Sequence, residues 1–253
     1  MQVVKCHMNT LMIHDIRKEY FDLDLSHYRL TFDDGLYSQY YYYPLFSGYK
    51  TELIFFISPA FVDSGIARPM FAGEHRSYVK SKTYMYDAFV NGKLDHAMNL
   101  EEVRQLAKQS NVRIGAHSYF HDVIITRKHP HKRKPISSWK QKQVLLPEGN
   151  AGLDVSIRSK LAFQGYEYRG GTLVQRSKDE WQKYIRYDTE LCIDWFTENL
   201  GFTPTLYCFP FNEYSDTLLS ELQGFGFKEF YGRRGDDSRG ILARVDIDAL
   251  FID

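Results

Sequence analysis

Several features that define large classes of proteins are absent from this sequence of 253 residues or scarce in it. It has only three cysteines, with no CxxC pair among them, and no apolar run approaches the roughly 20 residues of a membrane span. Its 32 Lys and Arg residues balance 32 Asp and Glu residues. These absences argue against a disulfide-stapled domain, a thiolate zinc site, an integral membrane segment and a nucleic-acid partner.

The N-terminal segment also lacks the continuous apolar stretch and small-residue cleavage site of a secretory signal peptide. We therefore expect a cytoplasmic protein. With 43% hydrophobic and 25% charged residues, the chain can bury a full core. Its length predicts a single domain that spans residues 1–253.

Aromatic residues, by contrast, are abundant. They make up 16% of the chain, with 19 tyrosines and 18 phenylalanines, and four consecutive tyrosines occupy positions 40–43. Aromatic rings stack on flat or ring-shaped ligands, and they also fill hydrophobic cores. Both interpretations of the tyrosine run stay open at this level.

Four short apolar segments are typical of buried strands: residues 28–32, 52–58, 111–116 and 205–209. Helical patterns lie between them. Asn99 and Ser177 each precede a glutamate three positions on, which predicts a capped helix start, and a third helix is expected from Ser215 to Gly224. The alternation predicts an α/β fold with a largely parallel sheet, in a chain long enough to close a barrel.

Two stretches interrupt the alternation: residues 61–99, which lack a clear period, and residues 122–176, which are longer than an ordinary connection. We interpret the second as an insertion that forms a lid, a binding loop or an unstructured excursion. It contains a basic run, residues 127–142, with no acidic residue. This run is either a solvated loop or a local anion-binding patch.

Two adjacent carboxylates, Asp33 and Asp34, end the first of these strands and precede Gly35. Glycine frees the backbone to turn, and adjacent side chains on a strand point in opposite directions. One carboxylate can therefore bind a metal ion while the other stays free to act as a base. Asp-Gly is also a common turn signal, so the pentapeptide alone leaves a simple turn open.

His117 and His121 follow another expected strand. Two imidazoles four residues apart can meet on one ion if the segment forms a helical turn, although a surface pair has the same spacing. Together with Asp34 they provide one carboxylate and two imidazoles, a set that suits zinc or a similar divalent ion. The carboxyl ends of parallel strands share one edge, where active sites gather, so a metal site is predicted there.

At these residues the sequence resembles the polysaccharide deacetylase family, the carbohydrate esterases with a NodB homology domain. TFDDG at positions 31–35 matches the family's first motif, and HSYFH at positions 117–121 matches its second, H-[ST]-x-x-H. Residues 201–211 are similar to the stretch that leads into its third motif, R-x-P-[YF]. The resemblance implies a distorted (β/α) barrel of the NodB type with insertions at about residues 61–99 and 122–176.

The resemblance also implies roles for individual residues. Asp34, His117 and His121 would hold zinc or another divalent metal ion, and Asp33 would be the general base that takes a proton from a metal-bound water. The backbone N–H of Phe211 would stabilise the oxyanion of the tetrahedral intermediate. Four further residues are expected to contact the substrate: Tyr37, Tyr119, Pro210 and Asn212.

The sequence departs from the family's pattern in two places. Cys208 stands where the third motif has an arginine, so another group must orient Asp33, and Arg244 and Arg233 are candidates on charge alone. The family's late Leu-x-His motif, which supplies the catalytic acid, has no counterpart, because no histidine follows position 131. The remaining candidate acids are Asp246, Asp248, His129 and His131.

The expected function is that of a metal-dependent hydrolase that removes an acetyl group from an N-acetylated sugar in a glycan or glycoconjugate precursor. A phosphate- or lipid-linked sugar would suit the basic run at Lys132, Arg133 and Lys134. Two alternatives stay open. One is a catalytically impaired sugar-binding domain that retains the metal site, and the other is a hydrolase of a non-sugar amide or formamide.

Overall fold

A parallel eight-stranded sheet organises the chain. The computed structural model describes residues 9–128, 138–145 and 155–251. The strand order is β11-β10-β9-β4-β3-β2-β1-β12, and each neighbouring pair is parallel. The strands are β1 (Thr10–Ile13), β2 (Arg29–Phe32), β3 (Leu53–Ile57), β4 (Val112–Ala116), β9 (Leu206–Cys208), β10 (Glu229–Gly232), β11 (Ile241–Ala243) and β12 (Val245–Asp246). The predicted α/β class and the four predicted strands are confirmed.

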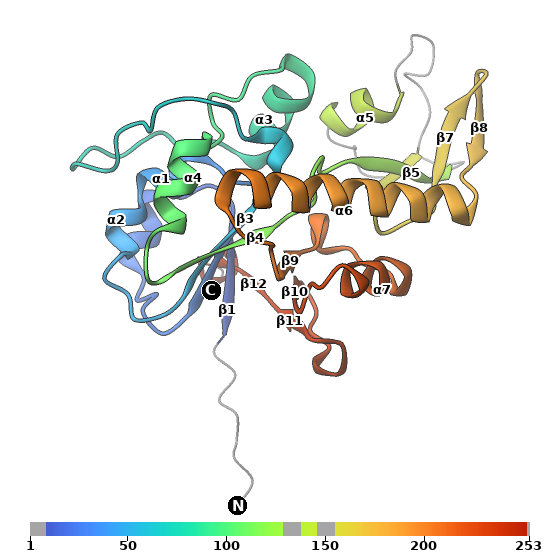
Figure 1. The fold of residues 1–253 in the computed structure, drawn as a ribbon. Coiled ribbons are helices and arrows are strands. Elements are labelled where there is room, and N and C mark those ends of the chain that lie inside the picture. Colours follow the sequence, from blue (N-terminus) through green and yellow to red (C-terminus); the bar gives the residue numbers. More distant parts are fainter. Residues whose placement is uncertain (1–8, 129–137, 146–154, 252–253) are drawn as a thin grey trace, which may run out of the picture.

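A single residue, Arg244, joins the two edges of this sheet. β11 ends directly before it and β12 begins directly after it, yet these two strands stand at opposite ends of the strand order. The two edges must therefore approach each other at Arg244, and the sheet curves into a nearly closed barrel (Figure 1). This is the distorted (β/α) barrel that the resemblance implied.

Helices flank the barrel, with α6 crossing the front of the view in Figure 1. They are α1 (Tyr37–Tyr41), α2 (Tyr43–Phe46), α4 (Leu100–Ala107), α6 (Lys178–Leu200) and α7 (Asp216–Gly224). Asn99 and Ser177 form complete capping boxes, and Ser215 caps α7, so the predicted helix starts are confirmed. α6 ends at Gly201, whose φ of 78° is the left-handed conformation that glycine adopts most readily.

The two irregular stretches contain secondary structure of their own. Residues 61–99 include α3 (Ser81–Tyr86), which continues into a π-helical turn (Asp87–Asn91). The described part of residues 122–176 contains α5 (Ser138–Leu145) and an antiparallel sheet of order β6-β5-β7-β8. Its strands are β5 (Val123–Lys128), β6 (Val155–Ser159), β7 (Tyr166–Arg169) and β8 (Thr172–Gln175). An unstructured excursion is therefore excluded for these described residues.

Part of the basic run lies outside the described residues. Residues 129–137 lie outside the described part of the chain, and with them the expected anion-binding residues and two of the candidate acids. Those residues are Lys132, Arg133, Lys134, His129 and His131. Short 3-10 turns complete the described elements at Lys18–Asp22, Pro59–Phe61, Pro210–Asn212, Asp237–Arg239 and Ile247–Phe251.

The run of four tyrosines belongs to the hydrophobic core. Tyr40, Tyr41, Tyr42 and Tyr43 are between 0% and 9% exposed. Their hydroxyls still find partners at the edge of the core: that of Tyr40, for example, donates to Gln105 Oε1 at 2.6 Å. Tyrosine suits such positions because its ring packs against apolar neighbours while its hydroxyl forms a hydrogen bond. Core packing, and not a sugar-stacking surface, accounts for this run.

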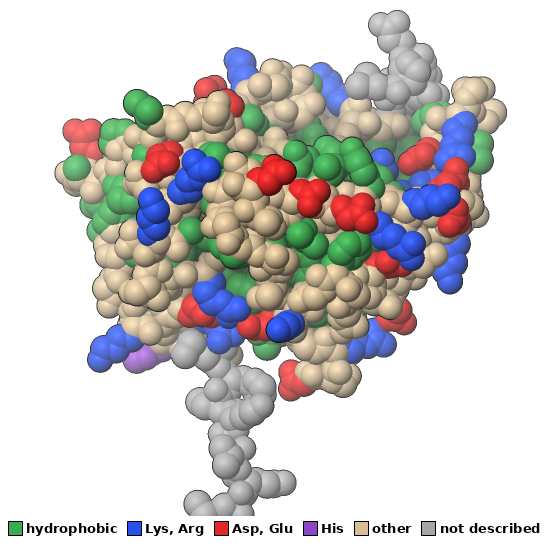
Figure 2. All heavy atoms as spheres, in the orientation of Figure 1, with side chains coloured by type: hydrophobic (Ala, Val, Ile, Leu, Met, Phe, Trp, Pro, Cys, Tyr) green, Lys and Arg blue, Asp and Glu red, His purple; other side chains and the backbone are tan. Residues whose placement is uncertain are grey.

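The surface carries charges of both signs. On the face shown in Figure 2, Lys and Arg side chains lie among Asp and Glu side chains, as the balanced composition suggests. Among the helices of the described residues, none is both long and apolar enough to cross a membrane.

Close packing between β4 and its neighbours makes Gly115 intolerant of a side chain. A Cβ added at Gly115 would lie 2.6 Å from Phe56 Cε1 and 2.9 Å from Leu206 Cβ. We expect Gly115→Ala to lower the free energy of unfolding by about 1–3 kcal/mol, the usual cost of overpacking a core. Gly224→Ala is the matched control, because its added Cβ meets no atom within 4 Å. Urea unfolding measures both, and equal stabilities for the two variants would contradict the packing argument.

Candidate active site

Polar residues follow three of the four consecutive strands β4-β3-β2-β1 at the same edge of the barrel. His14 follows β1, Asp33 and Asp34 follow β2, and His117 follows β4. These strands are parallel, so their carboxyl ends open onto one edge of the barrel. The structure therefore brings the two predicted motifs to a common site.

Asp34, His117 and His121 form a tight cluster there. Asp34 Oδ1 lies 3.3 Å from His117 Nε2 and 3.4 Å from His121 Nε2. One possible ligand atom from each residue lies within 4.8 Å of the others, and no residue of the three is more than 3% exposed. The predicted ligand set is thus assembled in one buried place.

The donor atoms of this cluster fit a divalent cation. Asp34 Oδ1 and His121 Nδ1 are buried without a hydrogen-bond partner among the described residues. Leaving such an atom unpaired costs about 1–3 kcal/mol. Asp34 Oδ1 faces two imidazole nitrogens and makes no hydrogen bond within the described residues. A cation bound between these three atoms would give the oxygen a partner.

Asp33, His117 and Cys208 form a second group of possible ligands. Burial raises the pKa of the Cys208 thiol and so disfavours the thiolate, which is the form that binds metal.

An irregular loop, and not a helical turn, brings the two histidines together. Ser118 and His121 have φ angles of 63° and 55°, which a right-handed helical turn does not contain. Ser118 Oγ accepts the backbone N–H of His121 at 2.9 Å and holds the loop in this shape. His117 Nδ1 lies 2.9 Å from the Cys208 carbonyl oxygen, to which it donates, and this contact turns Nε2 towards Asp34.

Ionisation of Asp34 and His121 suits metal binding. Burial alone would raise the pKa of Asp34, but its close contact with His117 and the electrostatic influence of His121 and His14 hold it well below its usual range. Burial lowers the pKa of His121 to about 3, against the attraction of Asp34. A metal ion requires an ionised carboxylate and neutral imidazoles, which are the forms favoured at Asp34 and His121. Burial would lower the pKa of His117, but its contacts with Cys208 and Asp34 raise this pKa well above its usual value, so a metal ion would have to displace a proton from His117.

Asp33 contacts a different set of groups. Its Oδ1 lies 2.6 Å from Arg244 Nη1, both residues are at most 3% exposed, and Cys208 Sγ lies 3.5 Å from Oδ2. Burial by itself would raise the pKa of Asp33, but the Arg244 guanidinium outweighs it and holds this pKa below its usual value. Of the two arginines considered from the sequence, Arg244 orients Asp33, whereas Arg233 is exposed.

His14 is a residue of this site that the sequence analysis missed. Its Nε2 lies 4.0 Å from Asp34 Oδ2, and its side chain is 31% exposed. Gln39 Nε2 donates to the carbonyl oxygens of His14 and Asp33, at 2.8 and 2.6 Å, and so ties the ends of β1 and β2 together. The signal was present in the sequence, because TLMI at positions 10–13 is an apolar segment that ends at a histidine.

The two carboxyls expected as alternative acids serve elsewhere or lie at the surface. Asp248 accepts hydrogen bonds from Arg17 at 3.0 Å and from Tyr20 at 2.7 Å. Asp246 is exposed and is part of the edge strand β12. β1, which His14 follows, lies between β2 and β12 in the sheet.

The second insertion closes one side of the site with aromatic rings. The Trp139 ring on α5 stacks on Phe89 at 4.8 Å and lies 6.1 Å from the Phe211 ring. Phe211 in turn contacts His121 at 4.6 Å between ring centroids. Lys140 Nζ lies 3.8 Å from the centroid of the Phe211 ring. The insertion therefore packs against Phe211, which in turn contacts the candidate metal cluster.

Three of the four expected substrate-contacting residues border the cluster. Tyr119 belongs to the loop between the two histidines, and Pro210 and Asn212 flank Phe211, whose φ is 59°. Asn212 Oδ1 accepts a hydrogen bond from Arg244 Nη2 at 2.9 Å. Their contacts with a substrate stay predictions.

Tyr37 is placed differently from the other three. It is 4% exposed, and its hydroxyl donates to the Pro69 carbonyl oxygen at 2.6 Å. The guanidinium groups of Arg68 and Arg76 lie 3.7 and 4.4 Å from its ring centroid. Its expected contact with substrate also stays a prediction.

Comparisons with known proteins agree with this architecture. No family model and no curated protein matches the sequence. Among solved structures, a de-N-acetylase from Aggregatibacter actinomycetemcomitans is 12% identical, with a TM-score of 0.61 over 94% of this chain and 93% of that chain. The deacetylase domain of BpsB from Bordetella bronchiseptica is 14% identical, with a TM-score of 0.62 over 94% and 96%.

IcaB from Ammonifex degensii is 14% identical, with a TM-score of 0.56 over 94% of this chain and 91% of that chain. Likeness at such low identity is a likeness of fold. The chain therefore has the NodB-type barrel fold of the polysaccharide deacetylases.

Asp188, from the middle of α6, fixes the centre of the histidine loop. Its Oδ1 accepts the N–H of Tyr119 at 3.0 Å and its Oδ2 accepts the N–H of Phe120 at 3.1 Å. It is 1% exposed, and burial raises its pKa to about 7 although the two hydrogen bonds act to lower it. Nothing in the sequence marked this residue, because it follows Tyr119 by 69 positions and lies within a helix.

The raised pKa of Asp188 predicts a pH dependence of stability. The folded state favours the protonated carboxyl, so this residue's contribution to the free energy of unfolding falls as pH rises from about 4 to 7, and changes no further above that. Between pH 5 and pH 7.5, wild type should lose about 2 kcal/mol relative to Asp188→Asn, which cannot titrate. Urea unfolding at both pH values measures this difference, and parallel pH dependences would contradict it.

Proposed function

We propose that this protein is a metal-dependent hydrolase that removes the acetyl group from an N-acetylated sugar. The observation that carries the proposal is the cluster of Asp34, His117 and His121, with the buried carboxylate of Asp33 beside it. Support also comes from the fold, since the solved structures that share it include a de-N-acetylase and a deacetylase domain. The sugar itself stays unspecified.

Asp34, His117 and His121 would hold the ion, for which zinc is the first choice given one carboxylate and two imidazoles. A divalent ion bound there lowers the pKa of water towards about 7 and polarises the acyl oxygen. The remaining chemistry is assigned to residues of this chain.

Asp33 would take the proton of the attacking water, because Arg244 keeps its carboxylate ionised and in place. The backbone N–H of Phe211 would donate to the oxyanion of the tetrahedral intermediate. His14 would protonate the leaving amine, since its partly exposed imidazole stands beside the cluster and imidazole is the side chain best suited to proton transfer near neutral pH. The bond between the carbonyl carbon and the sugar nitrogen then breaks, and acetate and the free amine leave.

The base assignment predicts that Asp33→Asn keeps the metal and loses the reaction. Acetate release from N-acetylated sugars should fall about 10²- to 10⁴-fold, the usual contribution of a general base. Asp34→Asn should instead lose the metal. Asp24→Asn, a change at a side chain that is 69% exposed, is the matched control and should do neither.

Metal content by mass spectrometry, together with acetate and formate release from a panel of N-acetylated and N-formylated compounds, distinguishes the alternatives. Bound metal and saturable glycan binding without amine release would favour a sugar-binding domain, and formate release a different amide hydrolase. Full activity of Asp33→Asn would refute the assignment of the base.

The acid assignment predicts that His14→Gln lowers the maximal rate of acetate release about 10²- to 10⁴-fold while the metal stays bound. Because the acid limb and the base limb of a pH profile report different groups, the variant should also lose the decline in rate at high pH. His27→Gln is the control, since His27 is 82% exposed and its only described ion pair is with Asp24. An unchanged pH profile in His14→Gln would assign the acid to another group.

A further inference from the structure

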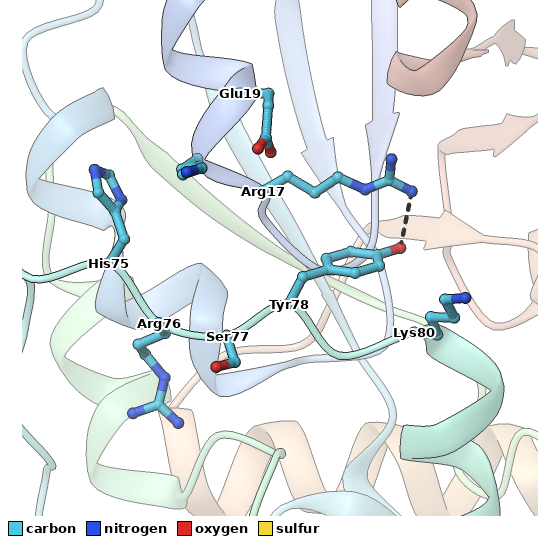
Figure 3. Close-up of a pocket in the computed structure, with 8 residues that line it drawn as sticks. Arg17, Glu19, His75, Arg76, Ser77, Tyr78 and Lys80 are labelled. Carbon is cyan, nitrogen blue, oxygen red and sulfur yellow. Dashed lines mark hydrogen bonds between the residues drawn. The ribbon is translucent and has the colours of Figure 1, made fainter.

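A hollow lies at the rim of the barrel, formed by the segment that follows β1 and by part of the first insertion (Figure 3). Its volume is about 730 Å³, large enough for a charged sugar or another group of similar size. The lining residues are Arg17, Lys18, Glu19, His75, Arg76, Ser77, Tyr78 and Lys80. We call this hollow the basic rim pocket.

Positive charge dominates the basic rim pocket. Four of its lining residues are Arg or Lys, and Glu19 is the one acidic residue among them. Arg17 pairs with Asp248, which lies outside the lining, at 3.0 Å. Lys18 and Lys80 form no ion pair with another residue of the described ranges 9–128, 138–145 and 155–251. Two ammonium groups are therefore available to an incoming anion.

The pocket is a built feature and not a chance gathering of mobile side chains. The Arg17 guanidinium lies 4.4 Å from the Tyr78 ring centroid, and its Nη2 donates to the Tyr78 hydroxyl at 3.2 Å. Figure 3 shows the side chains of Arg17, Tyr78 and Lys80 extending towards the same side of the pocket, while that of Arg76 extends the other way. The backbone N–H of Val79 donates to buried Asp15, which anchors the segment that carries Tyr78 and Lys80.

Both segments that line the basic rim pocket lead directly to the metal cluster. Arg17 follows His14 by three residues, a span of at most about 11 Å between Cα atoms. Lys80 is the N-cap of α3, and the hydroxyl of Tyr84, four residues further along, donates to the Asp34 carbonyl oxygen at 3.1 Å. Four residues of helix advance about 6 Å. The pocket is therefore close enough for one extended ligand to reach both places.

We propose that the basic rim pocket binds an anionic group, a carboxylate or a phosphate, carried by a sugar unit near the N-acetylated sugar in the candidate active site. The inference rests on the proposed function and specifies its substrate as an acidic glycan. Arg17, already oriented by Asp248, presents a planar fork of donors, and Lys18 and Lys80 supply point charges. The exposed face of Tyr78, which is 38% exposed, offers a surface for the ring that bears the anion.

The test compares three probes that differ in charge: the neutral tetramer of N-acetylglucosamine, the same tetramer with carboxylates at C6, and the tetramer with a terminal phosphate. Binding is measured by calorimetry at low salt on metal-loaded Asp33→Asn protein, so that turnover does not interfere. We expect at least one anionic tetramer to bind about tenfold more tightly than the neutral one, which corresponds to about 1.4 kcal/mol. In 1 M salt, where the screening length is about 3 Å, the preference should disappear.

The double change Lys18→Gln and Lys80→Gln in the same background should reduce the preference to about twofold or less. The matched control is Lys50→Gln with Lys228→Gln, which removes two exposed lysines that precede β3 and β10 and so lie at the opposite edge of the sheet. The control should keep the preference. In the active protein, acetate release from the neutral tetramer should be the same with and without the Lys18 and Lys80 changes.

Preference for the carboxylated probe alone would assign a uronic acid, and preference for the phosphorylated probe alone a sugar phosphate. Equal binding of all three probes, a preference that survives the Lys18 and Lys80 changes, or an equal loss in the control would each overturn the proposal. A separate measurement tests the proposed function: if the active protein releases no acetate from any tetramer, the proposed function fails, whatever the binding preference.

Discussion

Two carboxylates, adjacent in the sequence and both buried, are the constraint on which the rest of the candidate site depends. Asp33 and Asp34 are each 2% exposed, and an isolated buried carboxylate would take up a proton. Each stays ionised because a different partner faces it. Arg244 pairs with Asp33, while His117 and His121 face Asp34. The proposed roles of Asp33 as base and Asp34 as metal ligand rest on this separation of partners.

The residues that keep these two buried carboxylates ionised and in place come from several parts of the fold. Arg244 stands where the two edges of the sheet meet, so closure of the barrel and neutralisation of Asp33 depend on the same residue. Removing one member of such a buried pair typically costs about 3–5 kcal/mol. Gln39 fastens the ends of β1 and β2, and Asp188 fastens the histidine loop from α6. Groups outside the motifs therefore hold the motif residues in their positions.

The two insertions extend the site in different directions. α5 of the second insertion places Trp139 against Phe89 and Phe211, which gives one side of the metal cluster an aromatic wall. The first insertion supplies Tyr78 and Lys80 to the basic rim pocket on the side of β1. The balanced charge of the whole chain conceals this local excess, because acidic residues elsewhere compensate for it. Composition alone carries no information about where charges gather.

Structural features that depend only on residues close together in the sequence could be predicted. The strands before Asp33 and His117, and the caps at Asn99, Ser177 and Ser215, were predicted from local patterns and are confirmed. The loop between the two histidines was not predictable from their spacing, because distant Asp188, together with Ser118, holds it in a shape that spacing alone does not specify.

The α/β class, the two motifs and the residue types of the candidate metal cluster could be predicted from the sequence, since each rests on a short segment whose chemistry is local. The tertiary structure was needed to show which arginine faces Asp33, that His14, directly after β1, stands beside the cluster, and that the four tyrosines fill the core. Those outcomes depend on strand order and barrel closure, which join residues more than 200 positions apart. Long-range packing of this kind leaves no periodic signal in the sequence.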